Sequence, residues 1–287
     1  MHLPARHFAT AILAFASLSV IAAPTGSPFS TALLEDESLW GDGQAEYNFY
    51  DATEVRYDAP RKSEVRHILV RENFLPNTKV KADDWKTPGA YPVFKLNQII
   101  QVPTGVYRYD QMHSAFWNAD TGKLEKFSLA SMDSCGNSYK EGRIARNRLT
   151  YDANTYWEKM DRVHREVNIP ETALFYDELP FKLRLLDWDN VTKFTAPLTK
   201  SVINSKADVL AFEPAKFTVE STDEAKRVTV EHVGGTDTFE FEPESPYTLR
   251  LWNKADGGRL QYRGGGRLDY WNHNAPGDEK WIEEVTE

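Results

Sequence analysis

The single cysteine of the chain, Cys135, is the strongest intrinsic nucleophile that the sequence offers. It lies in Ser134-Cys-Gly136, directly after a predicted strand over residues 124–132. A reactive thiolate needs a nearby histidine or another group that lowers the thiol pKa. No histidine is singled out by its spacing for this task. The sequence therefore favours packing as the role of Cys135, and a hydrolase that uses its thiol is the lesser alternative.

The histidines that follow residue 22 do not have the spacing of a metal site. No two are separated by two or four residues, and the chain lacks CxxC and HExxH sequences. We therefore predict no metal and no cofactor, and we expect most of these side chains to lie at the surface or at strand edges. They are His67, His113, His164, His232 and His273.

Three other groups of residues favour structural roles. The run from Asp187 to Asn190 lacks the glycine and later glutamate of a calcium loop, so we expect a solvated turn. No helix is predicted behind Gly264–Gly266, which favours a bend or bulge in a sheet over a phosphate loop. Acids on strands mostly face solvent, and we expect this of Glu46, Glu54, Glu64 and Glu72.

The elements that position these residues are predicted to be strands. From Gln44 the apolar side chains recur at every second position, which indicates a half-buried strand with Asp51 as an interruption. One predicted face carries Ala45, Tyr47, Phe49, Thr53, Val55 and Tyr57, and the other carries Glu46, Asn48, Glu54 and Arg56.

Similar patterns continue along the chain, separated by turn-forming sequences. Residues 118–123 predict the turn of a hairpin, 137–142 another turn, and 171–178 one or two helical turns, whereas 156–167 fit helix or strand. About a dozen strands without strand–helix alternation predict an all-β protein. We expect one large, strongly curved antiparallel sheet, a half-barrel-like meander with few short helices. Further predicted strands cover residues 65–72, 93–102, 112–117, 124–132, 144–151, 217–220, 227–233, 238–242, 247–252 and 260–262.

The first residues have the order of a secretory signal peptide, with Arg6, an apolar run over 8–21, and small residues before a cut after Ala22. The apolar run is short for a membrane anchor, and no later segment is apolar enough to span a bilayer. No cysteine near the cut offers a site for a lipid anchor. We predict a periplasmic or secreted protein with a signal peptide (1–22), a flexible leader (23–39) and a single β-rich domain (40–287).

The charge of the chain excludes one class of partner. The net charge is −9, and removal of Arg6 with the signal peptide makes the chain one unit more negative. An acidic chain without a basic stripe is unsuited to binding nucleic acid or anionic lipid surfaces.

Several short motifs resemble a family of uncharacterised exported bacterial proteins and lipoproteins, some of which carry the label septum formation inhibitor Maf. The resemblance covers roughly residues 40–271 and implies neither an activity nor catalytic residues. Proteins properly called Maf are cytoplasmic nucleotide pyrophosphatases with an α/β fold, and neither feature fits this chain. The motifs are Trp40-Gly-Asp-Gly-Gln-Ala-Glu46, Arg56-Tyr57, Lys79-Val-Lys-Ala-Asp83, Thr104-Gly-Val-Tyr-Arg-Tyr109 and Ser134-Cys-Gly136.

Two non-enzymatic functions fit these observations. In the first, the concave face of the curved sheet carries a lipid or another apolar or amphipathic small molecule, because several strands are apolar on both faces. In the second, the protein is a structural or interaction module that binds a protein of the cell envelope through an exposed patch or sheet edge. A gapless interior would rule out the carrier.

Overall fold

The computed structural model describes residues 26–158, 160–207 and 210–287, and these residues form one antiparallel sheet of 14 strands. The sheet runs from β8 through β1 to β14 and on to β9, so its two edges are β8 and β9 and it is not closed. The predicted all-β class and curved antiparallel sheet are confirmed. The predicted signal peptide, residues 1–22, lies outside the described residues.

The first half of the sheet is a meander that leads away from β1. Each of its strands pairs with the next one in sequence, and β1 also pairs with β14. Its strands are β1 (Ala45–Arg56), β2 (Ala59–Phe74), β3 (Tyr91–Pro103), β4 (Arg108–Asn118), β5 (Leu124–Met132), β6 (Asn137–Ala145), β7 (Arg148–Asn154) and β8 (Arg162–Asn168).

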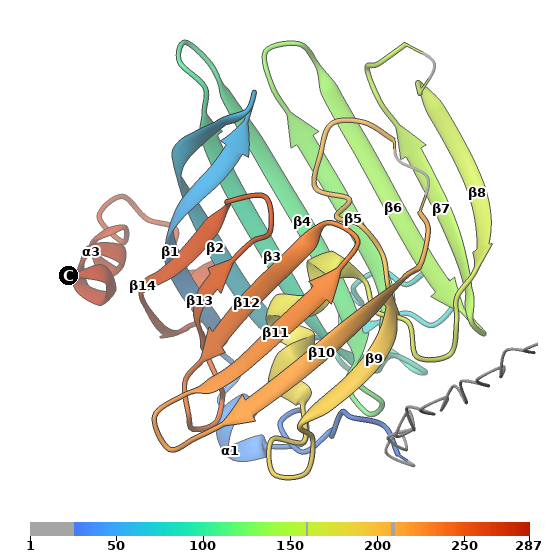
Figure 1. Cartoon of the computed structure of the whole chain (residues 1–287). Helices are drawn as coiled ribbons and strands as arrows, with labels where there is room; N and C mark the ends of the chain where they lie inside the picture. The colour runs from blue at the N-terminus through green and yellow to red at the C-terminus, as the bar shows by residue number, and fades with distance from the viewer. Residues whose placement is uncertain (1–25, 159, 208–209) are drawn as a thin grey trace, which may run out of the picture.

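The second half continues from the other side of β1 and curls over the inner face of the first (Figure 1). Its strands are β9 (Lys193–Leu198), β10 (Glu213–Ser221), β11 (Lys226–His232), β12 (Gly235–Phe241), β13 (Leu249–Asn253) and β14 (Arg259–Leu268). The helical elements are α1 (Glu37–Trp40), η1 (Tyr176–Glu178), α2 (Leu179–Lys182), η2 (Leu183–Leu185), η3 (Tyr270–Asn272) and α3 (Lys280–Thr286).

A helical insertion, which we define as η1, α2 and η2, lies between the two halves (Figure 1). Leu179 and Leu183 are fully buried against the second half, while Phe181 packs against the first. Burial of such apolar side chains is the main stabilising contribution to folding. In the part of the chain that the structure describes, no helix has the length and apolarity that crossing a bilayer requires.

The faces of β1 are reversed relative to the prediction. Glu46, Asn48 and Glu54, which we expected in solvent, are buried and belong to the inner face. The two carboxylates are stable there because partners from distant elements reach them, Arg184 for Glu46 and Lys254 for Glu54, while the Asn48 amide donates to Glu46 on the same strand. The outer face is covered as well, since Trp281 of α3 packs against Tyr47 at a ring-centroid distance of 5.8 Å.

Other boundaries also differ from the expected ones. Residues 137–142, predicted as a turn, belong to β6. The turns on either side lie at 133–136 and at Arg146 and Asn147, where φ is positive in both residues, so the strand predicted over 144–151 is interrupted. The helical turns expected over 171–178 begin only at Tyr176 and continue to Leu185. Of the ambiguous segment 156–167, the later part forms β8.

The glycines at 264–266 do lie at a bulge in the sheet. Phe49 pairs with Gly264 and Tyr50 with Tyr262, so Arg263 is the extra residue of β14. The glycines also let α3 approach closely, because a Cβ atom on Gly264 would lie 1.8 Å from the carbonyl oxygen of Val285.

The described part of the expected leader, residues 26–39, docks on the first half of the sheet. Leu33 and Leu34 are buried in a cluster with Phe94 and Trp117. The indole of Trp40 donates a hydrogen bond of 2.7 Å to the carbonyl oxygen of Leu33.

Candidate functional site

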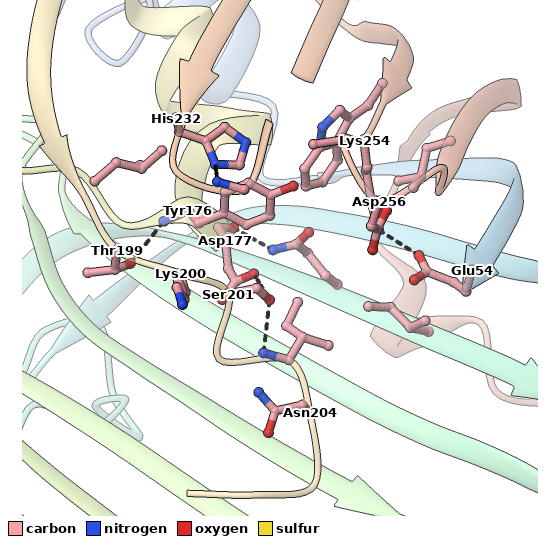
Figure 2. A pocket seen from close by; sticks show the side chains of 18 of the residues that line it. Glu54, Tyr176, Asp177, Thr199, Lys200, Ser201, Asn204, His232, Lys254 and Asp256 are labelled. Carbon is pink, nitrogen blue, oxygen red and sulfur yellow. Dashed lines mark hydrogen bonds and ion pairs between the residues drawn. The ribbon is translucent and has the colours of Figure 1, made fainter. Parts of the chain in front are cut away.

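A cavity of about 350 Å³ lies between the two halves of the sheet, beside the helical insertion (Figure 2). Its volume is near the lower end of the range of roughly 300–1,000 Å³ that is usual for small-molecule sites. One wall is apolar and comes from strands of both halves together with the segment after β9. It is formed by Val65, Ile100, Leu198, Ile203 and Leu260.

A charged group stands at one end of the cavity. The Lys254 Nζ atom donates a hydrogen bond of 2.6 Å to Glu54 Oε1, and Arg56 lies 3.7 Å from the same carboxylate. Lys254 also lies 4.8 Å from the ring centroid of Trp252. The charge of the buried Glu54 is therefore compensated within the protein, which is the usual requirement for a buried carboxylate.

A second carboxylate, Asp177, is held at the start of the helical insertion. It accepts a hydrogen bond of 2.6 Å from the Ser201 hydroxyl and another of 2.6 Å from the Val202 backbone N–H. Both donors are neutral, and no ion pair joins Asp177 to another described residue. Only 4% of Asp177 is exposed, so it is a buried carboxylate without a neighbouring positive charge in contact.

Asp237 anchors the aromatic side of the cavity. Its carboxylate accepts hydrogen bonds from the Tyr176 hydroxyl (2.6 Å) and the Trp252 indole (3.0 Å), and the Ala255 backbone N–H supplies another (2.7 Å). His232 Nε2 lies 3.2 Å away. Burial raises the pKa of Asp237, but these donors outweigh it and hold the pKa below its ordinary value. The network fixes both aromatic rings in place.

A row of polar side chains crosses the inner face of the first half beside the cavity. Asn48, His67, Gln98 and His113 occupy successive register positions on β1 to β4. The two histidines are buried, so they are exceptions to the expectation that most of the histidines lie at the surface or at strand edges. Burial lowers the pKa of His67 to about 3, with the charges of Lys254, Arg184 and His113 acting in the same direction.

Gln98 connects this row to the cavity. Its Nε2 atom donates to the backbone oxygen of Asp177 (2.7 Å) and lies 3.1 Å from His113 Nδ1. A backbone carbonyl only accepts hydrogen bonds, so the amide nitrogen must face it. The Gln98 side-chain oxygen then occupies the other position of the amide, where no described residue donates to it.

Cys135 does not line this cavity and lies in the turn between β5 and β6. The residue is exposed, and its backbone N–H donates a hydrogen bond of 2.6 Å to Asp133 Oδ1. The thiol hypothesis requires exposure and a histidine within hydrogen-bonding reach. The first condition is met, but among the described residues no histidine hydrogen-bonds to Cys135. The Asp187–Asn190 segment forms a local turn in which the Asn190 amide donates to Asp187.

The sequence did not identify the residues that build the cavity. Glu54, Asp177, Asp237 and Lys254 are far apart in the chain, and each stands in a local pattern that is typical of exposed strand or turn positions. Among the described residues, no three His, Cys, Asp or Glu side chains gather in a way that could hold a metal ion.

Comparisons with known proteins give little further information. No family model matches the sequence, and no curated protein matches it. One solved structure that is similar is the crystal structure of a β-barrel-like protein of the domain of unknown function DUF1849 from Brucella abortus. The similarity has a TM-score of 0.47 at 10% identity and covers 79% of this chain and 99% of that one. The candidate site therefore rests on the geometry of this chain.

Proposed function

We propose that this chain is a non-enzymatic binding protein that holds a small amphipathic molecule in the cavity between the two halves of its sheet. The cavity itself carries this proposal, because it lies between the two halves of the sheet and beside the helical insertion. The cavity has a volume of about 350 Å³, with an apolar wall on one side and fixed polar groups on the other. Such a wall with a few oriented polar groups is the usual composition of a small-molecule site.

The volume restricts the size of the ligand. It corresponds to roughly a dozen water molecules at about 30 Å³ each. This favours a ligand with one short hydrocarbon portion over a lipid with two long chains.

The test is a variant that fills the cavity. Ile203 is half-buried on the segment after β9, and Ile203→Trp is expected to occupy the space with an indole ring. The matched control is Val106→Trp, because Val106 is fully exposed on a loop and does not line the cavity. Thermal shift with a panel of short-chain amphipathic molecules, together with native mass spectrometry, measures binding.

We expect panel members to raise the melting temperature of the wild type and of Val106→Trp, and to leave Ile203→Trp unchanged. Stabilisation of Ile203→Trp to the same degree would contradict the proposal. So would a wild type that carries no ligand from its native host and responds to no member of the panel.

We further propose that the protein acts outside the cytoplasm, in the periplasm or the medium. The apolar run over residues 8–21 and the small residues after it support this compartment. Expression in a bacterial host should give an exported protein, and its intact mass should equal that of a chain that starts at Ala23. A cytoplasmic product that retains residues 1–22 would contradict this.

A second candidate function, an envelope interaction module, is favoured by an exposed apolar region on the outer face of the first half. Met112, Met132 and Tyr139 line a shallow depression there and are exposed. Large exposed apolar patches often mark contact sites. For this function, replacing Met112 and Met132 with glutamate should abolish crosslinking to an envelope protein, and Ile203→Trp should leave it intact.

A further inference from the structure

Resting on the proposed function, we propose that the ligand carries an organic ammonium group, which binds between the Asp177 carboxylate and the Gln98 side-chain oxygen. Both residues line the same cavity, and both are held in fixed positions by other contacts. The hydrocarbon part of the ligand lies against the apolar wall.

The first argument is the missing counter-charge at Asp177. Burial of a carboxylate without a cation is strongly unfavourable unless hydrogen bonds replace its hydration. Elsewhere in the interior, Glu46 pairs with Arg184 and Glu54 pairs with Lys254. Asp237 and Glu178 are held mainly by neutral donors, as Asp177 is, but Glu178 does not line the cavity and Asp237 has His232 beside it. Asp177 is supported by two neutral donors, and its carboxylate keeps acceptor capacity toward the cavity.

The second argument is the open acceptor on Gln98. This residue is 2% exposed, and its amide nitrogen is fixed by the Asp177 backbone oxygen and His113. Its oxygen receives no hydrogen bond from any described residue. An ammonium group has three N–H donors and no acceptor, so one such group can donate to both of these oxygens and also supply the positive charge that Asp177 lacks.

The Trp252 ring already has a cationic neighbour, since Lys254 lies 4.8 Å from its centroid, so this ring is not counted as a contact for the ligand. The cations already present offer little repulsion. Lys254 is paired with Glu54, and Lys200 is exposed to solvent, which screens its charge. Arg56 donates to the Gln111 side chain. The buried Lys140 does not line the cavity, and it donates to the Val202 backbone oxygen and the Asn204 side chain.

The experiment compares three probes of one chain length: n-octylammonium, octanoate and octanol. Isothermal titration calorimetry of the full chain measures their dissociation constants. Asp177→Asn removes the charge at similar size, and Glu213→Gln is the matched control. Glu213 is an exposed acid on the rim of the same cavity, so that substitution makes the same change in net charge.

We expect octylammonium to bind the wild type and Glu213→Gln more tightly than octanol does, and octanoate to bind most weakly. Asp177→Asn should weaken octylammonium binding about tenfold or more, because hydrogen bonds to charged groups are strong, and should leave octanol unchanged. If Asp177→Asn does not fold, Gln98→Met removes the other acceptor at similar size and should show the same selective loss.

The inference is overturned if octanoate binds as tightly as octylammonium, or if the loss in Asp177→Asn is equal for octylammonium and octanol. In either case the cavity still binds an amphipathic molecule, and the proposed function survives. If no octyl compound binds the wild type in a way that Ile203→Trp abolishes, the proposed function itself fails.

Discussion

Arg184 and Glu46 form a buried bidentate ion pair that joins the helical insertion to the central strand of the sheet. The two guanidinium nitrogens lie 2.9 Å and 2.8 Å from the two carboxylate oxygens. Arg184 Nε also donates a hydrogen bond of 2.7 Å to the backbone oxygen of Pro246. The guanidinium thus connects β1 and the insertion to the segment that leads into β13, and it holds the insertion that walls the cavity.

Removal of one partner of this pair should be strongly destabilising. Glu46→Gln leaves the Arg184 charge buried without its counter-ion, which typically costs about 3–5 kcal/mol. Chemical denaturation measures the free energy of unfolding. The control is Glu231→Gln, because the Lys216–Glu231 pair is exposed and such pairs contribute about 0–1 kcal/mol. The double variant Glu46→Leu with Arg184→Met should be less destabilised than Glu46→Gln. Equal effects of Glu46→Gln and Glu231→Gln would contradict this role.

His67 should make the protein sensitive to acid. Its Nε2 atom finds no partner among the described residues, and burial lowers its pKa from 6.5 to about 3. Between these values the unfolded chain binds a proton that the folded chain does not bind. Stability therefore falls as pH falls from about 6.5 to about 3, by up to about 1.4 kcal/mol per pH unit. Burial also lowers the pKa of His113, which acts in the same direction.

The measurement is the free energy of unfolding across this pH range. His67→Gln should flatten the dependence, whereas His164→Gln should not, because His164 is exposed on the edge strand β8. A slope that is identical in the wild type and in His67→Gln would show that His67 is protonated in the folded protein.

Period-two alternation was enough to predict the strands but not the direction of their faces. In β1 the pattern correctly placed alternate residues on opposite faces. The polar face was then assigned to solvent, yet Glu46 and Glu54 point inward. Their partners, Arg184 and Lys254, are separated from them by more than a hundred residues in the chain, so no local pattern reveals the pairing.

The cavity could not be predicted for the same reason. Asp177 and Gln98 come together because the start of the helical insertion contacts the inner face of β3. Whether that contact forms depends on how strongly the sheet curls. Curvature comes from strand twist and from bulges such as the one at Arg263. The sequence showed glycines at that point and predicted a bend or bulge, but it gave no measure of how closely the two halves approach.

The Cys135 thiol should react readily without contributing to binding. The residue is exposed in the turn between β5 and β6 and does not line the cavity. A maleimide should label the native protein at one site, as fast as it labels the unfolded chain. Cys135→Ser should retain octylammonium affinity within about twofold, which is within the usual effect of a surface substitution. A hydrolytic activity that disappears in Cys135→Ser would instead support the thiol enzyme.

The glycines of β14 should control the docking of the C-terminal helix. In Gly264→Ala the new Cβ atom would meet the carbonyl oxygen of Val285 at 1.8 Å, so α3 must shift or leave. Overpacking typically costs about 1–3 kcal/mol, and a loss of one or two kcal/mol raises the undocked population by roughly 5- to 30-fold. Trypsin cleavage after Lys280, followed by mass spectrometry, reports that population.

Gly266→Ala is the matched control in the same strand, because its Cβ atom would make only an ordinary contact of 3.6 Å with Trp281. It should be cleaved at the wild-type rate, whereas Gly264→Ala should be cleaved several-fold faster. When α3 leaves, Tyr47 and Phe49 lose the Trp281 ring that covers them, so the outer face of β1 becomes exposed. Equal cleavage of the two variants would mean that α3 is held by contacts other than its close approach to Gly264.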